Sequence, residues 1–315
     1  PMRITRALTA GTAVGLCLAL SGALTGCTHA EDWKAMRNDG ASAPAKGYDT
    51  SGIQPQEDII AMLPEGALAD GVLDIAAATD YPPAEFLDTG GTAIGYDVDL
   101  AKAIAAVLGV TSTTHTAEFD SILAAVGTKY DAGISSFTVS AEREAAMDMI
   151  AYINVGSRFD VVSGNPKGVD PSDHLNLCGL TIGVQTGTSQ EDAVREDSRG
   201  CTNAGRPAIA VRSYSTQSEA TTGLVGDVID AVYSDSTVAG YSVENTGGAV
   251  ETVGEVEDAL PQAVVMSKSS PDLNRAVQAA IQYLMDSGIW KDILDAWGIQ
   301  DAALTTAEMN PKVEE

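Results

Sequence analysis

Short apolar runs separated by helical patterns constrain the fold of this 315-residue chain most strongly. The runs VLDIAAA, YDAGISSF, LTIGVQT and DAVYSD have the length and the continuous hydrophobicity of strands that are buried on both faces. Each run is followed by a turn or by a segment with helical periodicity. This alternation predicts an α/β fold with a mostly parallel sheet.

Two helices are marked clearly by their apolar periodicity. The stretch YDVDLAKAIAAVLG predicts a helix over residues 96–109, in which Asp97 can cap the start and Gly109 suits the end. The stretch PDLNRAVQAAIQYLMDSG, residues 271–288, repeats this pattern. Ligand sites in open parallel sheets lie beyond the carboxyl ends of the strands, so those ends are where functional residues are expected.

The N-terminal segment is typical of an exported lipoprotein. Arg3 and Arg6 precede an uncharged stretch that continues to Cys27, as in a secretory signal sequence. Residues 24–27, LTGC, have the pattern of a bacterial lipobox. We therefore expect residues 1–26 to be removed and Cys27 to carry diacylglycerol and palmitate, which would anchor the protein to the outer face of the cytoplasmic membrane. The alternative is an ordinary cleaved signal sequence with a chance cysteine.

The remaining chain divides into a linker, a folded region and a tail. Residues 27–55 mix small residues, Pro and charge without a hydrophobic period, which predicts a flexible lipidated stalk. About 240 residues of folded chain follow, near the size at which one hydrophobic core gives way to two domains. Residues 301–315 are assigned to a C-terminal tail.

Charge and cysteine content exclude several functions. The chain has 44 acidic and 18 basic residues and a net charge of −26, which disfavours binding to nucleic acid. Cys178 and Cys201 form an isolated pair, and in an exported protein such a pair favours a disulfide over a zinc site. The three histidines have no metal-ligand spacing, so we expect no metal and no cofactor.

Six segments in sequence order resemble one family, the polar amino-acid-binding proteins of ABC importers, which are the family 3 solute-binding proteins. The resemblance extends from about residue 68 to residue 299, and its segments are DYPPAEF, GYDVDLAKAIAAVLGV, FDSILAAVGTKYDAGISSFTVSAERE, LCGLTIGVQTGTSQED, DAVYSDSTVAGY and SGIWKDILDAWGI. It implies a two-lobed periplasmic-binding-protein-like fold of type II with a hinge. Lobe one would comprise residues 56–162 and 256–300, and lobe two residues 163–255. The resemblance also implies a monomeric receptor that delivers an amino acid to a membrane permease.

The residues of the expected site match the charges of a free amino acid. Arg143 can offer a bidentate fork to the ligand carboxylate, and Thr188 and Ser189 follow a strand and open a helix that points at the same anion. Asp235, at the end of a strand, is placed to receive the ammonium group. Alternatively, Arg143 forms a surface ion pair and Ser189 is only a helix cap.

The family resemblance adds further residues to this site. It implies that Ser136 contributes a carbonyl and Thr138 a hydroxyl, and that Tyr81 and Phe119 are the aromatic walls of the pocket. An isolated aromatic residue is more commonly part of a hydrophobic core. Ala84 occupies a position where the family usually has Phe, and the acid that often precedes the tyrosine falls at Ala78. Asp80 is adjacent to Tyr81 and would add negative charge, so the preferred ligand side chain stays open.

Two other functions are considered. A dehydratase-type enzyme acting on prephenate-like acids could use the same two-lobed scaffold, with Asp80, Glu118 or Asp120 as acid or base. A sensor ectodomain would need a following membrane-spanning or kinase segment, which we do not expect from the residues up to Glu315.

Overall fold

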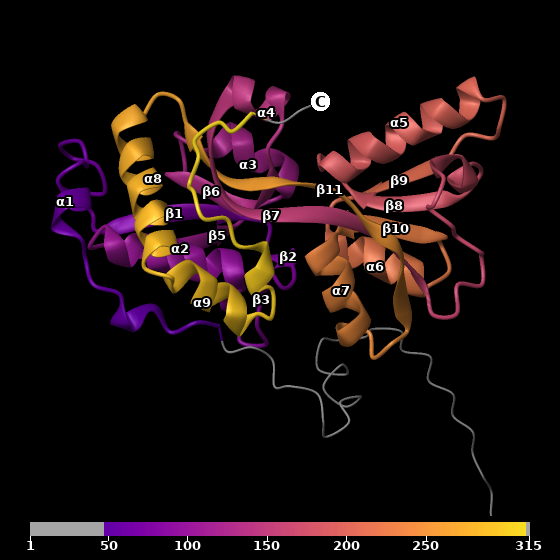
Figure 1. Cartoon of the computed structure of the whole chain (residues 1–315), viewed down its shortest axis with the longest axis horizontal. Coiled ribbons are helices and arrows are strands. Elements are labelled where there is room, and N and C mark those ends of the chain that lie inside the picture. The colour runs from indigo at the N-terminus through magenta and orange to yellow at the C-terminus, as the bar shows by residue number, and fades with distance from the viewer. Residues whose placement is uncertain (1–46, 313–315) are drawn as a thin grey trace, which may run out of the picture.

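The computed structural model describes residues 47–312, which form two lobes side by side (Figure 1). Each lobe has a layer of strands with helices on both faces. The strands β7 (Met147–Val162) and β11 (Val250–Ser267) run through both lobes and connect them. The α/β, two-lobed fold class predicted from the sequence is confirmed.

The described residues form one eight-stranded sheet that continues through both lobes. Its order is β5-β1-β6-β11-β7-β10-β8-β9. The bounds of the six remaining strands are β5 Thr111–Thr116, β1 Val72–Ala77, β6 Ala132–Thr138, β10 Ala231–Asp235, β8 Thr181–Gln185 and β9 Ala210–Tyr214. The four apolar runs of the sequence correspond to β1, β6, β8 and β10, as predicted.

Parallel pairing is confined to the two ends of this sheet. In lobe one, β1 pairs in parallel with β5 and β6, and in lobe two, β8 pairs in parallel with β9 and β10. The connecting strands β7 and β11 are antiparallel to each other and to their outer neighbours. A small antiparallel sheet lies at the edge of lobe one, with strands β2 (Asp80–Tyr81), β3 (Glu85–Leu87) and β4 (Ala93–Ile94).

Helices cover both faces of the lobe-one strands. One face carries the larger core, to which α2, α8 and α9 contribute, and the other face is covered by α3. Short helices α1 and α4 lie at the periphery (Figure 1). Their bounds are α1 Glu57–Ile60, α2 Tyr96–Val107, α3 Phe119–Ala125, α4 Ala141–Ala146, α8 Pro271–Asp286 and α9 Ile289–Ala296.

The start of α2 differs from the prediction. Gly95, not Asp97, occupies the N-cap position, and its backbone φ is 132°. A Cβ at Gly95 would lie 2.0 Å from the Ala84 carbonyl oxygen, so only glycine fits. Asp97 is buried in the first turn and accepts hydrogen bonds from Ser136 and Tyr152. Asp97 therefore connects α2 to strands β6 and β7, and the local sequence could not indicate these contacts.

Lobe two has separate cores on the two faces of its strands. Helix α5 (Ser189–Asn203) covers one face, and α6 (Gln217–Val225) and α7 (Ser236–Asn245) cover the other. The predicted disulfide is confirmed, because Cys178 at the end of the 3-10 helix His174–Leu177 is bonded to Cys201 in α5. It fixes the long helix to the segment that precedes β8.

The passage from lobe one to lobe two lies inside β7. Val155 belongs to the lobe-one core and Phe159 to a lobe-two core, whereas the sequence analysis placed the boundary after residue 162. Strand β7 continues from one lobe into the other without a turn, so the amino-acid composition does not change where the lobes meet. The sequence therefore contains no signal for a boundary inside this strand. On β11 the passage coincides with irregular pairing between Val253 and Leu260.

The expected stalk and tail are shorter than predicted. Tyr48 donates its backbone N–H to Asp99 Oδ2 at 2.8 Å, and Ile53 is buried in the lobe-one core, so packing begins before residue 55. Near the C-terminus, Met309 pairs with Ile150, and the Asn310 side chain accepts from the Met149 N–H. The signal sequence, most of the stalk and Cys27 lie outside the described residues.

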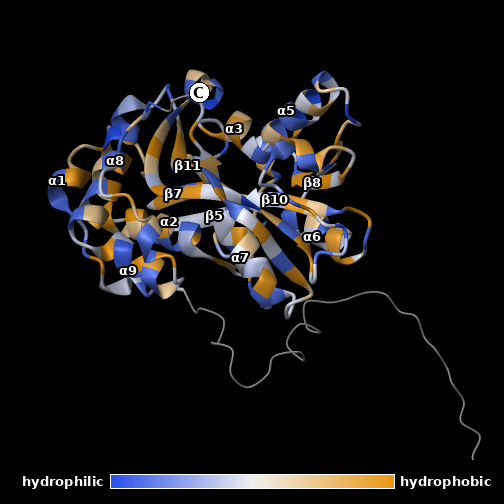
Figure 2. Ribbon diagram, turned by 45° about the vertical axis from the view of Figure 1, so that its right-hand side comes forward, coloured by the Kyte–Doolittle hydropathy of each residue, from blue (hydrophilic) through white to orange (hydrophobic). Residues whose placement is uncertain are grey.

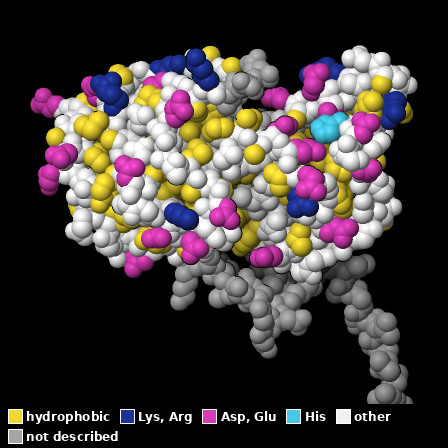
Figure 3. All heavy atoms as spheres, in the orientation of Figure 1, with side chains coloured by type: hydrophobic (Ala, Val, Ile, Leu, Met, Phe, Trp, Pro, Cys, Tyr) yellow, Lys and Arg dark blue, Asp and Glu magenta, His cyan; other side chains and the backbone are white. Residues whose placement is uncertain are grey.

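Hydropathy follows this layered architecture. Figure 2 shows hydrophobic stretches along the central strands and hydrophilic faces on outer helices such as α5 and α8. Carboxylate side chains are spread over both lobes on the face seen in Figure 3. Within residues 47–312, every helix is too short or too polar to cross a bilayer.

Candidate functional site

A cavity between the lobes brings together all eight residues that the sequence analysis assigned to a ligand site. Its side chains surround about 270 Å³, a volume that includes space open to solvent. Hydrogen bonds from Arg143 to Gly187 and from Ser189 to Thr138 cross this space, so the lobes meet closely here. The lining residues are Ala78, Tyr81, Glu85, Phe119, Ser135, Ser136, Thr138, Arg143, Gln185, Thr188, Ser189, Gln190 and Asp235.

Arg143 carries a positive charge into this cavity without a counter-ion. Its Nη1 donates to the Thr138 carbonyl at 2.7 Å, and its Nη2 donates across the cavity to the Gly187 carbonyl at 3.1 Å. Its guanidinium also lies 5.7 Å from the ring centre of Phe119. No carboxylate of residues 47–312 is within ion-pair distance, and burial lowers the pKa of Arg143. The surface ion-pair alternative is therefore wrong for the described part of the chain.

Asp235 lies on the lobe-two side, at the end of β10, and is 3% exposed. Its carboxylate accepts from Gln190 Nε2 at 2.8 Å and from Gln262 Nε2 at 2.7 Å. Its backbone N–H donates to the Tyr81 hydroxyl at 3.2 Å. Burial raises the pKa of Asp235 to about 6, although the hydrogen bonds from the two amides favour the ionised form. Sequence reasoning missed both glutamines, whose neutral amides hold the carboxylate in place.

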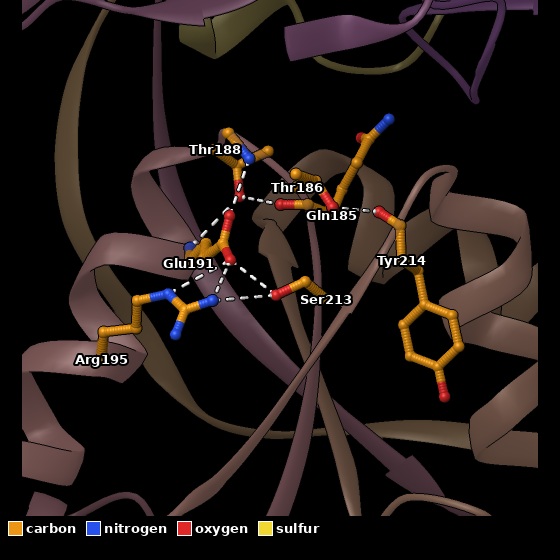
Figure 4. A network of polar contacts seen from close by, with 8 residues as sticks. Gln185, Thr186, Thr188, Glu191, Arg195, Ser213 and Tyr214 are labelled. Carbon is orange, nitrogen blue, oxygen red and sulfur yellow. Dashed lines mark hydrogen bonds and ion pairs between the residues drawn. The ribbon is translucent and has the colours of Figure 1, made fainter.

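The start of α5 is held by a polar network (Figure 4). Thr188 is the N-cap residue, and its hydroxyl accepts from the Glu191 N–H at 3.2 Å and donates to the Gln185 carbonyl at 2.7 Å. Glu191 also accepts from the Gly187 N–H at 2.8 Å and pairs with Arg195 at 2.5 Å. The helix start therefore has little freedom to move.

Ser189 is the first residue of α5, so the alternative that it caps the helix is wrong. Its hydroxyl donates to Thr138 Oγ1 at 3.3 Å, which connects the two lobes at the cavity. The N–H groups in the first turn of a helix have no partner within the helix and favour an anion. Thr188 can offer an anion only its backbone, since its hydroxyl is already bonded on both sides.

The lobe-one wall contains a buried carboxyl pair that sequence reasoning missed. Glu85 is 1% exposed, its Oε1 accepts from Ser135 Oγ at 2.6 Å, and its Oε2 meets no donor among the described residues. Behind it, Asp97 accepts from the Ser136 N–H at 2.8 Å and from the Tyr152 hydroxyl at 2.7 Å. Neither carboxyl forms an ion pair with a described residue.

Burial and the mutual repulsion of the two groups set their protonation. Burial, followed by the nearby Asp97 charge, raises the pKa of Glu85 well above its ordinary value. Burial likewise raises the pKa of Asp97 to about 6, against hydrogen bonds from Tyr152, from Ser136 and from Glu85 itself, which favour the ionised form of Asp97. Two carboxyls this close without a cation hold a proton between them at neutral pH. A cationic ligand group would remove the need for that proton.

The other predicted residues complete the wall. Ser136 has a left-handed φ of 51°, and its bonds to Asp97 hold that conformation. Phe119 stacks on Phe137 with ring centres 4.7 Å apart, and Tyr81 is buried, so both aromatics belong to a core as well as to the cavity. Among the described residues, no group of side chains could hold a metal ion.

Asp80 is not where the sequence analysis expected it. It does not line the cavity, and its Oδ2 accepts from the Gln217 N–H of lobe two at 2.7 Å. Glu118 and Asp120, considered as an acid or base, do not line the cavity either. The additional carboxyl group in the wall is that of Glu85, because strand β3 turns this side chain inward.

Comparison with known proteins gives one consistent family. Residues 73–300 match the bacterial extracellular solute-binding proteins, family 3. The arginine-binding protein ArgT of Corynebacterium glutamicum is 35% identical over 267 residues, which cover 84% of this chain and 86% of that protein. The L-cystine-binding protein TcyJ of Escherichia coli is 28% identical, over 72% of this chain and 82% of its own length.

Solved structures agree with these relatives. An ancestral arginine-binding protein bound to arginine has a TM-score of 0.66 and 30% identity, covering 72% of this chain and 98% of its own. The ancestral amino-acid-binding protein AncCDT-1, a precursor of cyclohexadienyl dehydratase, has a TM-score of 0.65 and 26% identity, covering 73% of this chain and 96% of its own.

Proposed function

This chain belongs to the bacterial extracellular solute-binding proteins of family 3, and we propose that it is an extracytoplasmic receptor for a basic amino acid, with L-arginine as its best ligand. The observation that carries this proposal is the charge pattern of the cavity. One unpaired cation, Arg143, faces two buried carboxyls, Asp235 and Glu85, neither of which has a cationic partner among the described residues. Arginine carries the complementary set, with one carboxylate and two cationic groups.

The backbone of the ligand is bound by residues from both lobes. The guanidinium of Arg143 pairs with the ligand carboxylate, and the Ser189 end of α5 contributes its first N–H groups from the other lobe. Asp235 receives the ammonium group, since Gln190 and Gln262 already hold its carboxylate toward the cavity. Leaving any one of these charges buried and unpaired would cost several kcal/mol, which gives the site its requirement for a zwitterion.

The side chain of the ligand is selected by Glu85. Its Oε2 meets no donor within the described structure, and a guanidinium supplies donors together with a positive charge. Tyr81 and Phe119 flank the aliphatic part. The names of two relatives support this assignment, because ArgT and the ancestral protein are described as arginine-binding proteins. The cystine-binding relative is the main reason to test other amino acids.

Transport follows from closure of the two lobes. A ligand that contacts both lobes favours the closed form by its differential affinity, and closure presents a new surface to the ABC permease. We propose that the protein acts as a monomer, anchored to the outer face of the cytoplasmic membrane through lipid on Cys27. Mass spectrometry of the protein isolated from membranes would detect the diacylglyceryl group on that cysteine.

We propose a binding function without catalysis. The ionisable residues of the cavity are used to pair ligand charges, and the relatives ArgT and TcyJ are named as binding proteins. The relationship of AncCDT-1 to a dehydratase defines the control experiment. Incubation of the purified protein with prephenate should leave the substrate unchanged.

A thermal-shift screen against the twenty amino acids tests the proposal. A ligand at a hundred times its Kd stabilises the folded protein by about 2.7 kcal/mol. We expect L-arginine to give the largest rise in melting temperature and lysine a smaller one. The proposal is wrong if no amino acid stabilises the protein, or if a neutral or acidic amino acid stabilises it most.

A further inference from the structure

The two lobes are joined by a hydrogen bond that lies outside the ligand cavity. Asp80, in strand β2 of lobe one, accepts from the backbone N–H of Gln217 in lobe two, with 2.7 Å between Oδ2 and N. The Ser218 hydroxyl also donates to the Asp80 carbonyl at 3.4 Å. None of these three residues lines the cavity.

The Gln217 N–H is free to make this bond because of its place in α6. Thr216 is the N-cap residue, and it forms a capping box with Glu219 that uses the Glu219 N–H and the Thr216 N–H. Gln217 is the first residue of the helix, so its N–H has no acceptor within the helix. The positive end of the helix dipole adds to the attraction for a carboxylate.

We propose that Asp80 and the first N–H of α6 form an interlobe latch, which stabilises the closed form and slows the release of bound ligand. The inference builds on the proposed receptor function, because a latch matters only if the lobes open and close. It assigns Asp80 a positioning role, since its carboxylate does not face the ligand. A hydrogen bond to a charged group contributes enough to change a closing equilibrium appreciably.

The latch can be separated from the interlobe hydrogen bonds at the cavity. Arg143, Ser189 and Tyr81 also bridge the lobes, but each of them lines the cavity and is proposed to touch the ligand. Removing one of those side chains would change binding and closure together. The contact between Asp80 and Gln217 involves a backbone donor and an acid outside the cavity, so it can be broken while every ligand contact stays in place.

A matched pair of substitutions at Gln217 isolates the N–H group. Gln217→Pro removes the donor at the first helical position, where the fixed φ of proline fits. The preceding residue, Thr216, has φ −127° and ψ 150°, which is the extended conformation that proline requires before it. Gln217→Ala loses the same side chain but keeps the N–H. The difference between the two variants therefore reports the hydrogen bond alone.

Stopped-flow measurement of arginine release gives the first readout. We expect Gln217→Pro to release arginine about tenfold faster than Gln217→Ala, with similar melting temperatures in the absence of ligand. Asp80→Ala should show the same acceleration, and adding it to Gln217→Pro should have no further effect, because both remove one interaction. Asp80→Asn keeps an acceptor oxygen but removes its charge, so its acceleration should be smaller.

The radius of gyration from small-angle X-ray scattering gives a second readout that needs no ligand. Gln217→Pro should be more expanded than Gln217→Ala because its lobes open more easily. Equal release rates for these two variants, or additive effects of Asp80→Ala and Gln217→Pro, would overturn the latch. If the unmodified protein binds no amino acid, the receptor proposal fails, and equal radii for the two Gln217 variants would then overturn the latch separately.

Discussion

Arg143 and Asp235 face the same cavity from opposite lobes, and neither forms an ion pair with the other or with any residue of the described chain. Arg143 is bonded to two backbone carbonyls and Asp235 to two side-chain amides. Neutral partners hold both charged groups in position without neutralising them. A zwitterion placed between them supplies the two missing counter-charges.

Arg143→Ala should abolish amino-acid binding and leave the fold intact. A ligand carboxylate would then be buried without its main partner, at a cost of about 3 kcal/mol or more. Arg143→Lys keeps the charge but loses the planar fork, so it should bind more weakly than the parent and more tightly than the alanine variant. Calorimetry that gives the parent affinity for Arg143→Ala would remove this residue from the site.

Asp235→Asn should weaken binding by at least tenfold, equivalent to about 1.4 kcal/mol. The change preserves size and removes the charge that offsets the ligand ammonium. Asp160→Asn is the matched control, because Asp160 is also a buried lobe-two carboxyl but does not line the cavity. We expect the control to bind with the parent affinity, and equal losses in both variants would argue against a direct contact.

The stability of the ligand-free protein should fall as pH rises. Burial raises the pKa of Asp160 to about 7, and its Oδ1 has no hydrogen-bond partner among the described residues. An acid whose pKa is higher in the folded state takes up a proton on folding, so its contribution is complete below about pH 4, the ordinary aspartate range. The stabilisation from protonated Asp160 then declines as pH rises above about 4, and it is lost as pH passes through about 7.

Differential scanning calorimetry of Asp160→Asn tests whether the deprotonation of Asp160 makes the folded protein less stable as pH rises. The variant cannot ionise at this position, so its advantage over the parent should be small at pH 5 and should grow toward pH 8. The high net negative charge also destabilises the protein as pH rises, but it affects parent and variant alike. A constant difference in melting temperature between pH 5 and pH 8 would show that Asp160 does not titrate in this range.

Several residues that line the cavity could be located from the sequence because they end or follow recognisable strands. Asp235 ends strand β10, and Arg143 and Ser189 lie in the helices that follow β6 and β8. Within each lobe, the parallel strands bring their carboxyl ends to one edge of the sheet. Strands β6 and β10 run in opposite directions, so the meeting of the two edges at the cavity depends on the crossing strands β7 and β11, which no local pattern indicated. The family resemblance added Ser136, Thr138, Tyr81 and Phe119, and no local pattern distinguished the two aromatic residues from ordinary core aromatics.

The residues that were missed acquire their roles through tertiary contacts. Gln262 reaches Asp235 only because β11 crosses between the lobes, and nothing around Gln262 marks that crossing. Asp97 fits the pattern of a helix cap, yet it is bonded to strands β6 and β7. Asp80 likewise fits a pocket acid until the position of α6 is known. The role of a polar residue was hardest to predict from the sequence where the local pattern allowed two different roles.

Calorimetric comparison of L-arginine with L-citrulline tests the central claim most directly, because citrulline has nearly the same shape but a neutral side chain. We predict that the parent binds arginine at least a hundredfold more tightly, about 2.7 kcal/mol, since Glu85 pairs with the guanidinium. Glu85→Gln should lose most of this preference by weakening arginine binding while binding citrulline about as well as the parent does. Equal affinities of the parent for arginine and citrulline, or an unchanged preference in Glu85→Gln, would contradict the account.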